Sequence, residues 1–538
     1  MVEESHYENS GVFEMNNSTS LARVIVRQLI EAGISDVVIS PGSRNAPLSL
    51  AFYAAAQEGL IKLHIRIDER TAAFFALGII KATGKPVPIV CTSGTAVANY
   101  HPAVLEANHT NSPLLVLTAD RPAMLRRTGA NQTTEQARIF GKAVRYFADI
   151  DGPIYPMELP LDSLRSGPVH LNLQFDEPLL PDESSQWLSE INVSPKEFVP
   201  RTKPGTLRLV GARGVVVIGH DRGGLSVLEI TKFTKTLGWP IIAEDPLSFP
   251  EAVPHASIFL ASPEIRSTLI PQSVLVIGRT TLSRSINSFI NSSPITYVVD
   301  QRLATVDSDR QAERKFTELP QLQGVIQSDD WLAKWRKVSE RAHKLIQSLD
   351  GWNEAVIART VAAAIPNETA VFVSSSRPIR DLEAFASPRT GIQVYANRGL
   401  AGIDGNISTA LGIAYAHKAT LAILGDLSFL HDLTGLINKE GINCRFIVIN
   451  NDGGGIFSTL PQRGVDGFET VFGTPHGLNL VDIAKAIGVE AKQVTNLPDL
   501  ESEIKAPIIG ISVVVCNVPD REHNADNLKG IYDSLGSI

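Results

Sequence analysis

The stretch 421–460 constrains the fold of this chain most, because two short apolar runs in it both end in polar residues and glycine. The first run ends in Gly425 and Asp426, and the second ends in Asn450 and Asn451, closely followed by three glycines. A helical pattern separates the runs, so the stretch predicts a strand, a helix and a second strand. In an open parallel α/β sheet the carboxyl ends of such strands are adjacent, and ligands bind there.

The side chains at these strand ends predict a site for a hard divalent cation. Asp426 and Asn451 would each offer an oxygen, and a loop carbonyl such as that of Gly453 would add another. Magnesium takes such oxygen ligands and usually shares them with ligand phosphates. A helix after Ser428 would offer free N–H groups to the same phosphates. The alternative is two ordinary turns, in which Gly, Asp and Asn are also frequent.

The two segments together resemble a known motif. A GD pair followed roughly 25 residues later by NN is similar to the diphosphate–magnesium motif of thiamine diphosphate (ThDP) enzymes. GDLSFLHDL and NNDGGGIFSTLPQ resemble one branch more closely, the 2-succinyl-5-enolpyruvyl-6-hydroxy-3-cyclohexene-1-carboxylate (SEPHCHC) synthases of menaquinone biosynthesis. Leu427 and Asp452 depart from the broad pattern, but neither is a proposed metal ligand. The resemblance implies ThDP and Mg²⁺ (or Mn²⁺) as cofactors, held by Gly425, Asp426, Leu427, Ser428, Asn451, Gly453 and Ile456.

Length and composition exclude several classes of protein. A chain of 538 residues exceeds what one core usually serves, so two to four domains are expected, with three the natural number. A net charge of -8, with scattered basic residues, argues against a nucleic-acid surface. An acidic, polar N-terminus and the lack of an apolar run of about 18 residues predict neither a signal peptide nor a membrane span. Three widely separated cysteines in apolar patterns predict reduced, buried thiols and a cytoplasmic protein.

Glu69 is the candidate catalytic residue. It closely precedes an apolar helical pattern expected over 72–80 and would therefore lie in the first helical turn. A carboxylate there interacts favourably with the helix dipole by only about 0.3–1 kcal/mol. The segment IDERTAAFFALG, however, resembles the glutamate motif of ThDP enzymes. The resemblance implies that Glu69 bonds N1' of the aminopyrimidine and so promotes loss of the proton from the thiazolium C2.

Four further segments, ADRP, GANQ, VSSSRPIRDL and ANRGLAGIDGNISTALG, resemble the synthases. The turn after the first strand, Ser-Pro-Gly-Ser-Arg, is a plausible carboxylate-binding turn on its own pattern. Without the resemblance, Asp120 and Arg121 would instead suggest an ion pair on the surface. The resemblance implies that Ile403 forces ThDP into its V shape. The expected substrate-binding residues are Ser43, Arg44, Arg121, Gln132, Arg284, Ser376, Arg380, Arg398, Phe457 and Leu460.

The chain divides into three segments of different composition. A weak repeat relates 76–79 to 410–413, each followed by a lysine and a strand, and predicts one α/β unit at each end of the chain. The stretch 176–207, rich in Pro, Ser and charge, reads as a linker into a separate α/β segment without a dinucleotide fingerprint. The helix expected over 331–349 reads as solvated and connecting. We therefore expect an α/β protein of three doubly wound parallel-sheet domains: a pyrimidine-binding domain (1–185), a linker with a central domain (186–350) and a diphosphate-binding domain (351–538).

The resemblance implies decarboxylation of 2-oxoglutarate and addition of the resulting succinyl semialdehyde carbanion to isochorismate. Both substrates are dicarboxylates, and arginine pairs with carboxylates through two parallel hydrogen bonds. In the family the active sites are shared between chains, so a homodimer or homotetramer is expected. Two alternatives stay open: another ThDP carboligase or decarboxylase, and a non-catalytic regulatory protein of the same fold. None of the 12 histidines are adjacent, unlike the His pair of certain decarboxylases.

Overall fold

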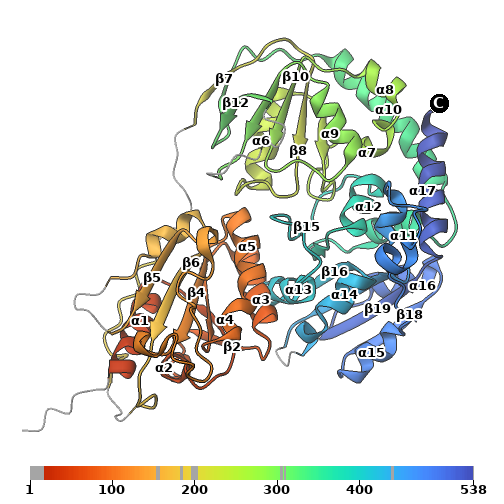
Figure 1. Ribbon diagram of the computed structural model, residues 1–538. Helices are drawn as coiled ribbons and strands as arrows, with labels where there is room; N and C mark the ends of the chain where they lie inside the picture. Colours follow the sequence, from red (N-terminus) through yellow and green to blue (C-terminus); the bar gives the residue numbers. More distant parts are fainter. Residues whose placement is uncertain are drawn as a thin grey trace, which may run out of the picture.

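The computed structural model describes residues 17–152, 158–181, 186–195, 204–302, 307, 311–437 and 441–536. Its strands form three large parallel sheets and one pair, and helices cover both faces of the large sheets (Figure 1). This confirms the expected α/β class with three sheet domains. The long expected linker lies partly outside the described residues, at 182–185 and 196–203.

The N-terminal sheet has six strands in the order β2-β1-β3-β4-β6-β5. Its central strands are buried on both faces, which explains their continuous runs of Val, Ile and Leu. The elements are α1 (Asn17–Glu31), β1 (Asp36–Ile39), α2 (Ala46–Gln57), β2 (Lys62–Ile65), α3 (Glu69–Thr83), β3 (Val87–Cys91), α4 (Thr95–Asn99), α5 (His101–Thr110), β4 (Leu114–Asp120), β5 (Tyr146–Ile150) and β6 (Val169–Gln174).

The middle sheet has five strands in the order β12-β11-β10-β8-β9, with the pair β13-β7 beside it. The elements are β7 (Thr206–Arg208), β8 (Gly214–Ile218), α6 (Val227–Leu237), β9 (Ile241–Ala243), α7 (Ala256–Phe259), α8 (Pro263–Thr268), β10 (Ser273–Ile277), α9 (Arg284–Asn291), β11 (Thr296–Val299), β12 (Ala312–Phe316), β13 (Gln321–Gln323) and α10 (Asp329–Ser348).

The C-terminal sheet has the order β15-β14-β16-β17-β19-β18. The elements are α11 (Glu354–Ala364), β14 (Ala370–Val373), α12 (Arg377–Phe385), β15 (Gln393–Tyr395), α13 (Asn406–Tyr415), β16 (Thr420–Gly425), α14 (Asp426–His431), β17 (Cys444–Asn450), α15 (Leu480–Ala486), β18 (Glu490–Val494), α16 (Leu497–Lys505), β19 (Ile511–Asn517) and α17 (Arg521–Gly536). When the six strands of each sheet are numbered in chain order, both sheets have the strand order 2-1-3-4-6-5. The duplication suggested by the repeat is therefore present in the topology.

Two expectations about helices were wrong. Helix α14 begins at Asp426 rather than after Ser428, because Gly425 already serves as its N-cap. Helix α10 is not simply solvated: Trp331 and Trp335 on one of its faces are buried in the core of the middle domain. Its many charged residues concealed this apolar stripe, since only a third of a helix surface needs to be apolar to pack on a core.

The two copies of the repeat contact each other where α3 crosses α13 (Figure 1). A Cβ on Gly78 would lie 2.2 Å from the carbonyl oxygen of Thr409, and one on Gly412 would lie 2.1 Å from that of Phe75. The backbones can approach this closely only because both residues are glycine. One continuous cluster of buried apolar side chains spans this crossing and joins the two sheets.

Two further findings bear on the chain as a whole. All three cysteines are buried and free, as expected. Among the described residues, no helix combines the length and the apolar character needed to cross a membrane.

The glycine at the crossing gives a direct test of domain packing. We predict that Gly78→Ala lowers the free energy of unfolding by about 1–3 kcal/mol, because the added methyl group forces the helices apart. Gly530→Ala is the matched control, since Gly530 also lies in a helix but a Cβ there would meet nothing outside its own helix backbone within 4 Å. It should be neutral or stabilising by up to about 1 kcal/mol. Calorimetric melting of both variants checks this; equal effects would contradict the role of the crossing.

Candidate functional site

The carboxylate of Asp426 lies at the carboxyl end of β16, beside the carboxyl end of β17. Only 3% of the residue is exposed. One carboxylate oxygen accepts a hydrogen bond from the Leu427 N–H (2.7 Å), and the other accepts from the Gly453 N–H (2.7 Å). Burial raises the pKa of Asp426, and these N–H groups partly offset that effect. A bound cation would hold the carboxylate ionised.

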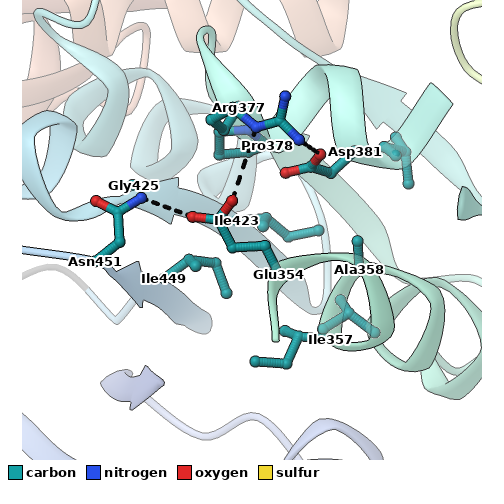
Figure 2. Close-up of a pocket in the computed structure, with 12 residues that line it drawn as sticks. Glu354, Ile357, Ala358, Arg377, Pro378, Asp381, Ile423, Gly425, Ile449 and Asn451 are labelled. Atoms are coloured by element: carbon teal, nitrogen blue, oxygen red, sulfur yellow. Dashed lines mark hydrogen bonds and ion pairs between the residues drawn. The ribbon is translucent and has the colours of Figure 1, made fainter. Parts of the chain in front are cut away.

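The side chain of Asn451 lies on the adjacent strand end, 8% exposed. Its Nδ2 donates a hydrogen bond to Glu354 Oε1 at 2.6 Å (Figure 2). Its Oδ1 is buried and accepts no hydrogen bond from the described part of the chain. A buried acceptor without a donor costs about 1–3 kcal/mol, so this oxygen is available for a ligand.

The glycine loop after β17 fits closely against the segment that ends at Gly473. Gly453 has a φ of +130°, and a Cβ there would lie 2.1 Å from the Gly473 carbonyl oxygen. The carboxylate of Asp452 accepts hydrogen bonds from the N–H groups of His476 (2.9 Å) and Gly477 (2.8 Å). This explains why an aspartate is tolerated at 452, where the family pattern has asparagine.

These residues fit a magnesium ion. The candidate donors are one carboxylate and one amide oxygen without a partner among the described residues, both hard oxygen ligands, and the backbone of Gly453 lies beside the carboxylate. The described residues contain no group of three or more His, Cys, Asp or Glu side chains that could hold a metal. A site with a single charged side chain leaves coordination positions for phosphate oxygens, as magnesium sites commonly do.

The loop that carries Ile403 is fastened to this site. The Ile403 carbonyl accepts from Ser428 Oγ (3.0 Å) and from Asn406 Nδ2 (2.8 Å), and Asn406 also donates to Ser428 Oγ. The side chain of Ile403 is half-buried and not part of the core. Gly425 and Leu427 flank Asp426, so these expected cofactor residues lie around one strand end.

Glu69 is the first residue of α3, and Asp68 is the N-cap, accepting from the Arg70 N–H at 2.9 Å. The Glu69 carboxylate lies near the buried Cys91 and Tyr100: burial and then the charge of Glu69 raise the pKa of Cys91. Within the chain, the residues beside Glu69 contact the far end of α14. Arg70 donates to the His431 carbonyl at 2.8 Å, and Thr434 Oγ1 donates to Asp68 at 2.7 Å.

The other expected residues of the N-terminal domain gather at the carboxyl edge of its sheet. Gln132 is exposed and has a φ of +54°, and its loop is fixed by Ser93 Oγ, which donates to the Gln132 carbonyl at 2.8 Å. Ser43 is exposed after β1, and Arg121 follows β4. Arg44, in contrast, is 8% exposed and donates to the Phe175 carbonyl at 3.0 Å, so it already has a partner within its domain.

A cavity between the middle and C-terminal domains brings together four of the expected residues: Arg284, Arg380, Ile456 and Leu460. Arg284 is exposed at the start of α9, and Tyr532 of α17 also lines the cavity. Phe457 packs against Phe472, with ring centroids 5.5 Å apart, and is not among the lining residues.

The N-terminus of α12 is shaped around this cavity. Ser376 has a φ of +73°, a conformation that costs a non-glycine residue about 1–3 kcal/mol. Its carbonyl accepts a hydrogen bond from Arg380 Nη1 at 2.6 Å. Burial, followed by the neighbouring charges of Arg377 and Arg398, lowers the pKa of Arg380. An anion in the cavity would relieve this repulsion.

Arg398 is not free. It is 2% exposed, and its Nη2 donates to Glu244 Oε1 of the middle domain at 2.6 Å. The backbone of the same loop is held by Glu106 of α5, which accepts from the N–H groups of Gly399 (2.8 Å) and Leu400 (2.7 Å). The loop that carries Arg398 and Ile403 is therefore fixed by one carboxylate from each of the other two domains.

Four contributors were missing from the sequence-based site: Glu106, Glu244, Glu354 and His476. His476 Nε2 lies 3.3 Å from Asp426 Oδ2. Each is a single ionisable residue whose partner lies far away in the chain. No local pattern distinguishes such residues from surface charges. The periodicity and spacing of the sequence therefore could not indicate them.

Comparison with known proteins identifies the family. Residues 19–139 match the model "Thiamine pyrophosphate enzyme, N-terminal TPP binding domain", residues 182–373 match "Middle domain of thiamine pyrophosphate", and residues 381–518 match "Thiamine pyrophosphate enzyme, C-terminal TPP binding domain". Thiamine pyrophosphate is another name for ThDP. The chain thus contains all three domains of this class of enzyme in order.

Curated relatives cover nearly the whole chain. The 2-succinyl-5-enolpyruvyl-6-hydroxy-3-cyclohexene-1-carboxylate synthase of Thermobifida fusca is 39% identical over 90% of this chain and 93% of its own. The synthase of the same name from Lysinibacillus sphaericus is 35% identical over 97% and 99%. Among solved structures, benzoylformate decarboxylase from Polynucleobacter necessarius shares the fold, with a TM-score of 0.64 at 15% identity over 93% of this chain and 98% of its own. The chain belongs to the ThDP-dependent SEPHCHC synthase family.

Proposed function

We propose that this protein catalyses the ThDP- and Mg²⁺-dependent decarboxylation of 2-oxoglutarate and the addition of the remaining succinyl semialdehyde unit to isochorismate, giving SEPHCHC for menaquinone biosynthesis. The observation that carries the proposal is the pair of oxygens at the ends of β16 and β17. One belongs to the buried carboxylate of Asp426, and the other is the Oδ1 of Asn451, which has no donor in the described part of the chain. The family membership of the whole chain supports the choice of reaction.

Each proposed cofactor residue has a distinct task. Asp426, Asn451 and the Gly453 carbonyl would hold Mg²⁺ and through it the diphosphate, with Gly425, Leu427 and Ser428 beside them. ThDP supplies an electron sink for decarboxylation. Ile403 and Ile456 would shape the apolar part of the cofactor site. Glu69 would form a hydrogen bond with N1' of the aminopyrimidine and hold the proton that lies between the two groups.

The proposed substrate residues supply positive charge for two dicarboxylates. Arg284 and Arg380 line one cavity, where Leu460 provides an apolar wall. Ser43, Arg121 and Gln132 lie at the carboxyl edge of the other sheet and would act from a second chain. Arginine suits this task because its planar fork binds a carboxylate through two hydrogen bonds. The proposed substrate site also includes Arg44, Ser376, Arg398 and Phe457.

We further propose a homodimer, or a homotetramer made of two such dimers, in which Glu69 of one chain completes the cofactor site of the other. Two large apolar side chains beside Glu69 support a covered surface here: Ile65 and Ile67 are 53% and 66% exposed in the single chain. Exposed apolar residues next to a polar site are typical of interaction surfaces. The same contact would occur twice, as two-fold symmetry requires.

Domain boundaries and location complete the proposal. We divide the chain into 1–185, 186–350 and 351–538, since each large sheet falls within one of these segments. A cytoplasmic location is supported by the three buried free thiols, which oxidising compartments usually convert into disulfides.

The assay that tests the function uses the purified chain with ThDP, Mg²⁺, 2-oxoglutarate and isochorismate. Release of carbon dioxide that depends on 2-oxoglutarate, with formation of a product from isochorismate, is expected. Pyruvate replaces 2-oxoglutarate in the control. Turnover of pyruvate in preference to 2-oxoglutarate would favour an acetolactate synthase-like enzyme, and ThDP binding without any turnover would favour a non-catalytic protein.

Glu69 is tested by Glu69→Gln. We predict that ThDP binding is largely kept, whereas exchange of the C2 proton for deuterium slows, because an amide cannot take up the N1' proton. Exchange is followed by NMR on the loaded protein. Glu58→Gln, an exposed change in the same domain, is the control and should exchange at the wild-type rate. An equally fast rate in Glu69→Gln would remove this residue from catalysis.

Replacing Arg380 or Arg398 by alanine is predicted to have different effects on the stability of the fold. Arg380→Ala should raise the KM for 2-oxoglutarate about 10- to 100-fold, since a hydrogen bond to a charged group contributes about 1.5–3 kcal/mol, and should melt near the wild-type temperature. Arg398→Ala should in addition destabilise the fold by about 3–5 kcal/mol, because it leaves the buried carboxylate of Glu244 without its charged partner. Steady-state kinetics measures the effect on substrate binding, and calorimetry measures the effect on stability. An unchanged melting temperature in Arg398→Ala would contradict a stabilising role of the Arg398–Glu244 ion pair.

Shared active sites are tested by mixing inactive chains. If Glu69→Gln and Asp426→Ala chains pair at random, about half the dimers are mixed, and each mixed dimer holds one intact site and one doubly altered site. We expect activity to recover to roughly a quarter of wild type on that counting. A preparation shown to contain mixed dimers but lacking activity would mean that each site is built within one chain.

A further inference from the structure

Glu354 lies behind the cation site, in the first turn of α11. Figure 2 shows its carboxylate between the amide of Asn451 and the guanidinium of Arg377. Asn451 Nδ2 donates to Glu354 Oε1 at 2.6 Å, and Arg377 Nε lies 3.8 Å from Glu354 Oε2. Only 10% of the Glu354 side chain is exposed. Glu354 does not line the cavity of Arg284 and Arg380, but it lines a smaller pocket together with Gly425 and Asn451.

The contact with Glu354 decides which way the Asn451 amide faces. An ionised carboxylate only accepts hydrogen bonds, whereas a carboxamide has a donor end and an acceptor end. The NH₂ end of Asn451 must therefore face Glu354, and Oδ1 must face the other way, where none of the described residues donates to it. The reverse orientation would place two oxygens against each other and turn the N–H groups toward a cation.

Both the backbone and the carboxylate of Glu354 have partners within the chain. Asn353 caps α11 by accepting from the Val356 N–H at 3.1 Å, which fixes the turn that carries Glu354. Arg377, ion-paired with Asp381 one turn along α12, approaches from the opposite side. Glu354 is thus positioned before any ligand binds, and it can impose an orientation on a neighbouring side chain.

We propose that Glu354 is a positioning residue that orients the Asn451 carboxamide so that its oxygen, not its nitrogen, is presented to the cation. The inference rests on the proposed function, since it assumes Asn451 as a ligand. It adds a residue on a different element, α11, whose effect on cation affinity is entirely indirect. Because Arg377 follows Ser376 in the chain, the same contact also ties the cation site to the helix that carries Arg380.

The first test is Glu354→Gln, in which the replaced side chain keeps its size but accepts either end of the Asn451 amide. Mg²⁺ is titrated calorimetrically into the protein at saturating ThDP, so the readout is cation affinity and not turnover. A 10- to 100-fold loss is expected, as for other residues that orient a metal ligand. Glu501→Gln, a change at a half-exposed side chain on α16 that is ion-paired with Lys505, is the matched control and should bind like wild type. Wild-type affinity in Glu354→Gln would overturn the inference.

A swap of the two side chains gives the sharper test. In Glu354→Gln/Asn451→Asp the amide donates and the carboxylate accepts, so one oxygen of residue 451 is again directed to the cation and the total charge is unchanged. Affinity for Mg²⁺ should recover to within a few-fold of wild type, whereas Asn451→Asp alone sets two carboxylates against each other and should bind poorly. A merely structural role of Glu354 predicts no recovery. A folded swap variant that binds Mg²⁺ 10-fold or more weakly than wild type would overturn the inference, and this outcome can be read even where Glu354→Gln alone does not fold.

Asp426→Ala separates this inference from the proposed function. It removes the charged ligand and should abolish Mg²⁺-dependent ThDP binding. If Asp426→Ala binds normally, the cation site itself is misplaced. If Asp426→Ala fails to bind but Glu354→Gln binds normally, only the role of Glu354 is wrong.

Discussion

The close crossing of α3 and α13 is the contact on which the rest of the architecture depends. Two glycines, Gly78 and Gly412, let the helix backbones touch, and the apolar clusters of the first and last sheets become one core. Since α3 begins at Glu69 and α13 leads into β16, which ends at Gly425 just before Asp426, this crossing sets the position of Glu69 relative to Asp426 within one chain. A change in helix spacing would displace Glu69 relative to Asp426, and with them the two proposed functional positions of the chain.

Buried carboxylates do much of the remaining positioning. Glu106 and Glu244, from the first and middle domains, hold the loop of Arg398, and Glu354 holds the amide of Asn451. A buried carboxylate is costly unless it is fully hydrogen-bonded, so each of these contacts adopts one arrangement rather than several. The middle domain, which lacks a nucleotide motif, thus contributes through Glu244 to the geometry of the site.

The parts of the fold that could be predicted from the sequence are those buried on both faces. The strands that end at Gly425 and at Asn450 were predicted from their continuous apolar runs, and the structure has a buried strand at each place. The missed strands β5, β12 and β18 each lie at the edge of a sheet and carry polar residues. Edge strands form because a neighbour offers backbone partners, and this information is absent from a local pattern. For the same reason the sequence indicated the polar residues at the strand ends, but not the carboxylates that contact them from other elements.

The most direct measurement of the central claim is a crystal structure with ThDP and Mn²⁺ bound, with anomalous scattering to locate the metal. We expect one anomalous peak per chain, within coordination distance of Asp426, of the oxygen of Asn451 and of the Gly453 carbonyl. We also expect Glu69 of the second chain to face the aminopyrimidine. A peak bound elsewhere, or a cofactor completed by Glu69 of its own chain, would contradict this assignment of the site.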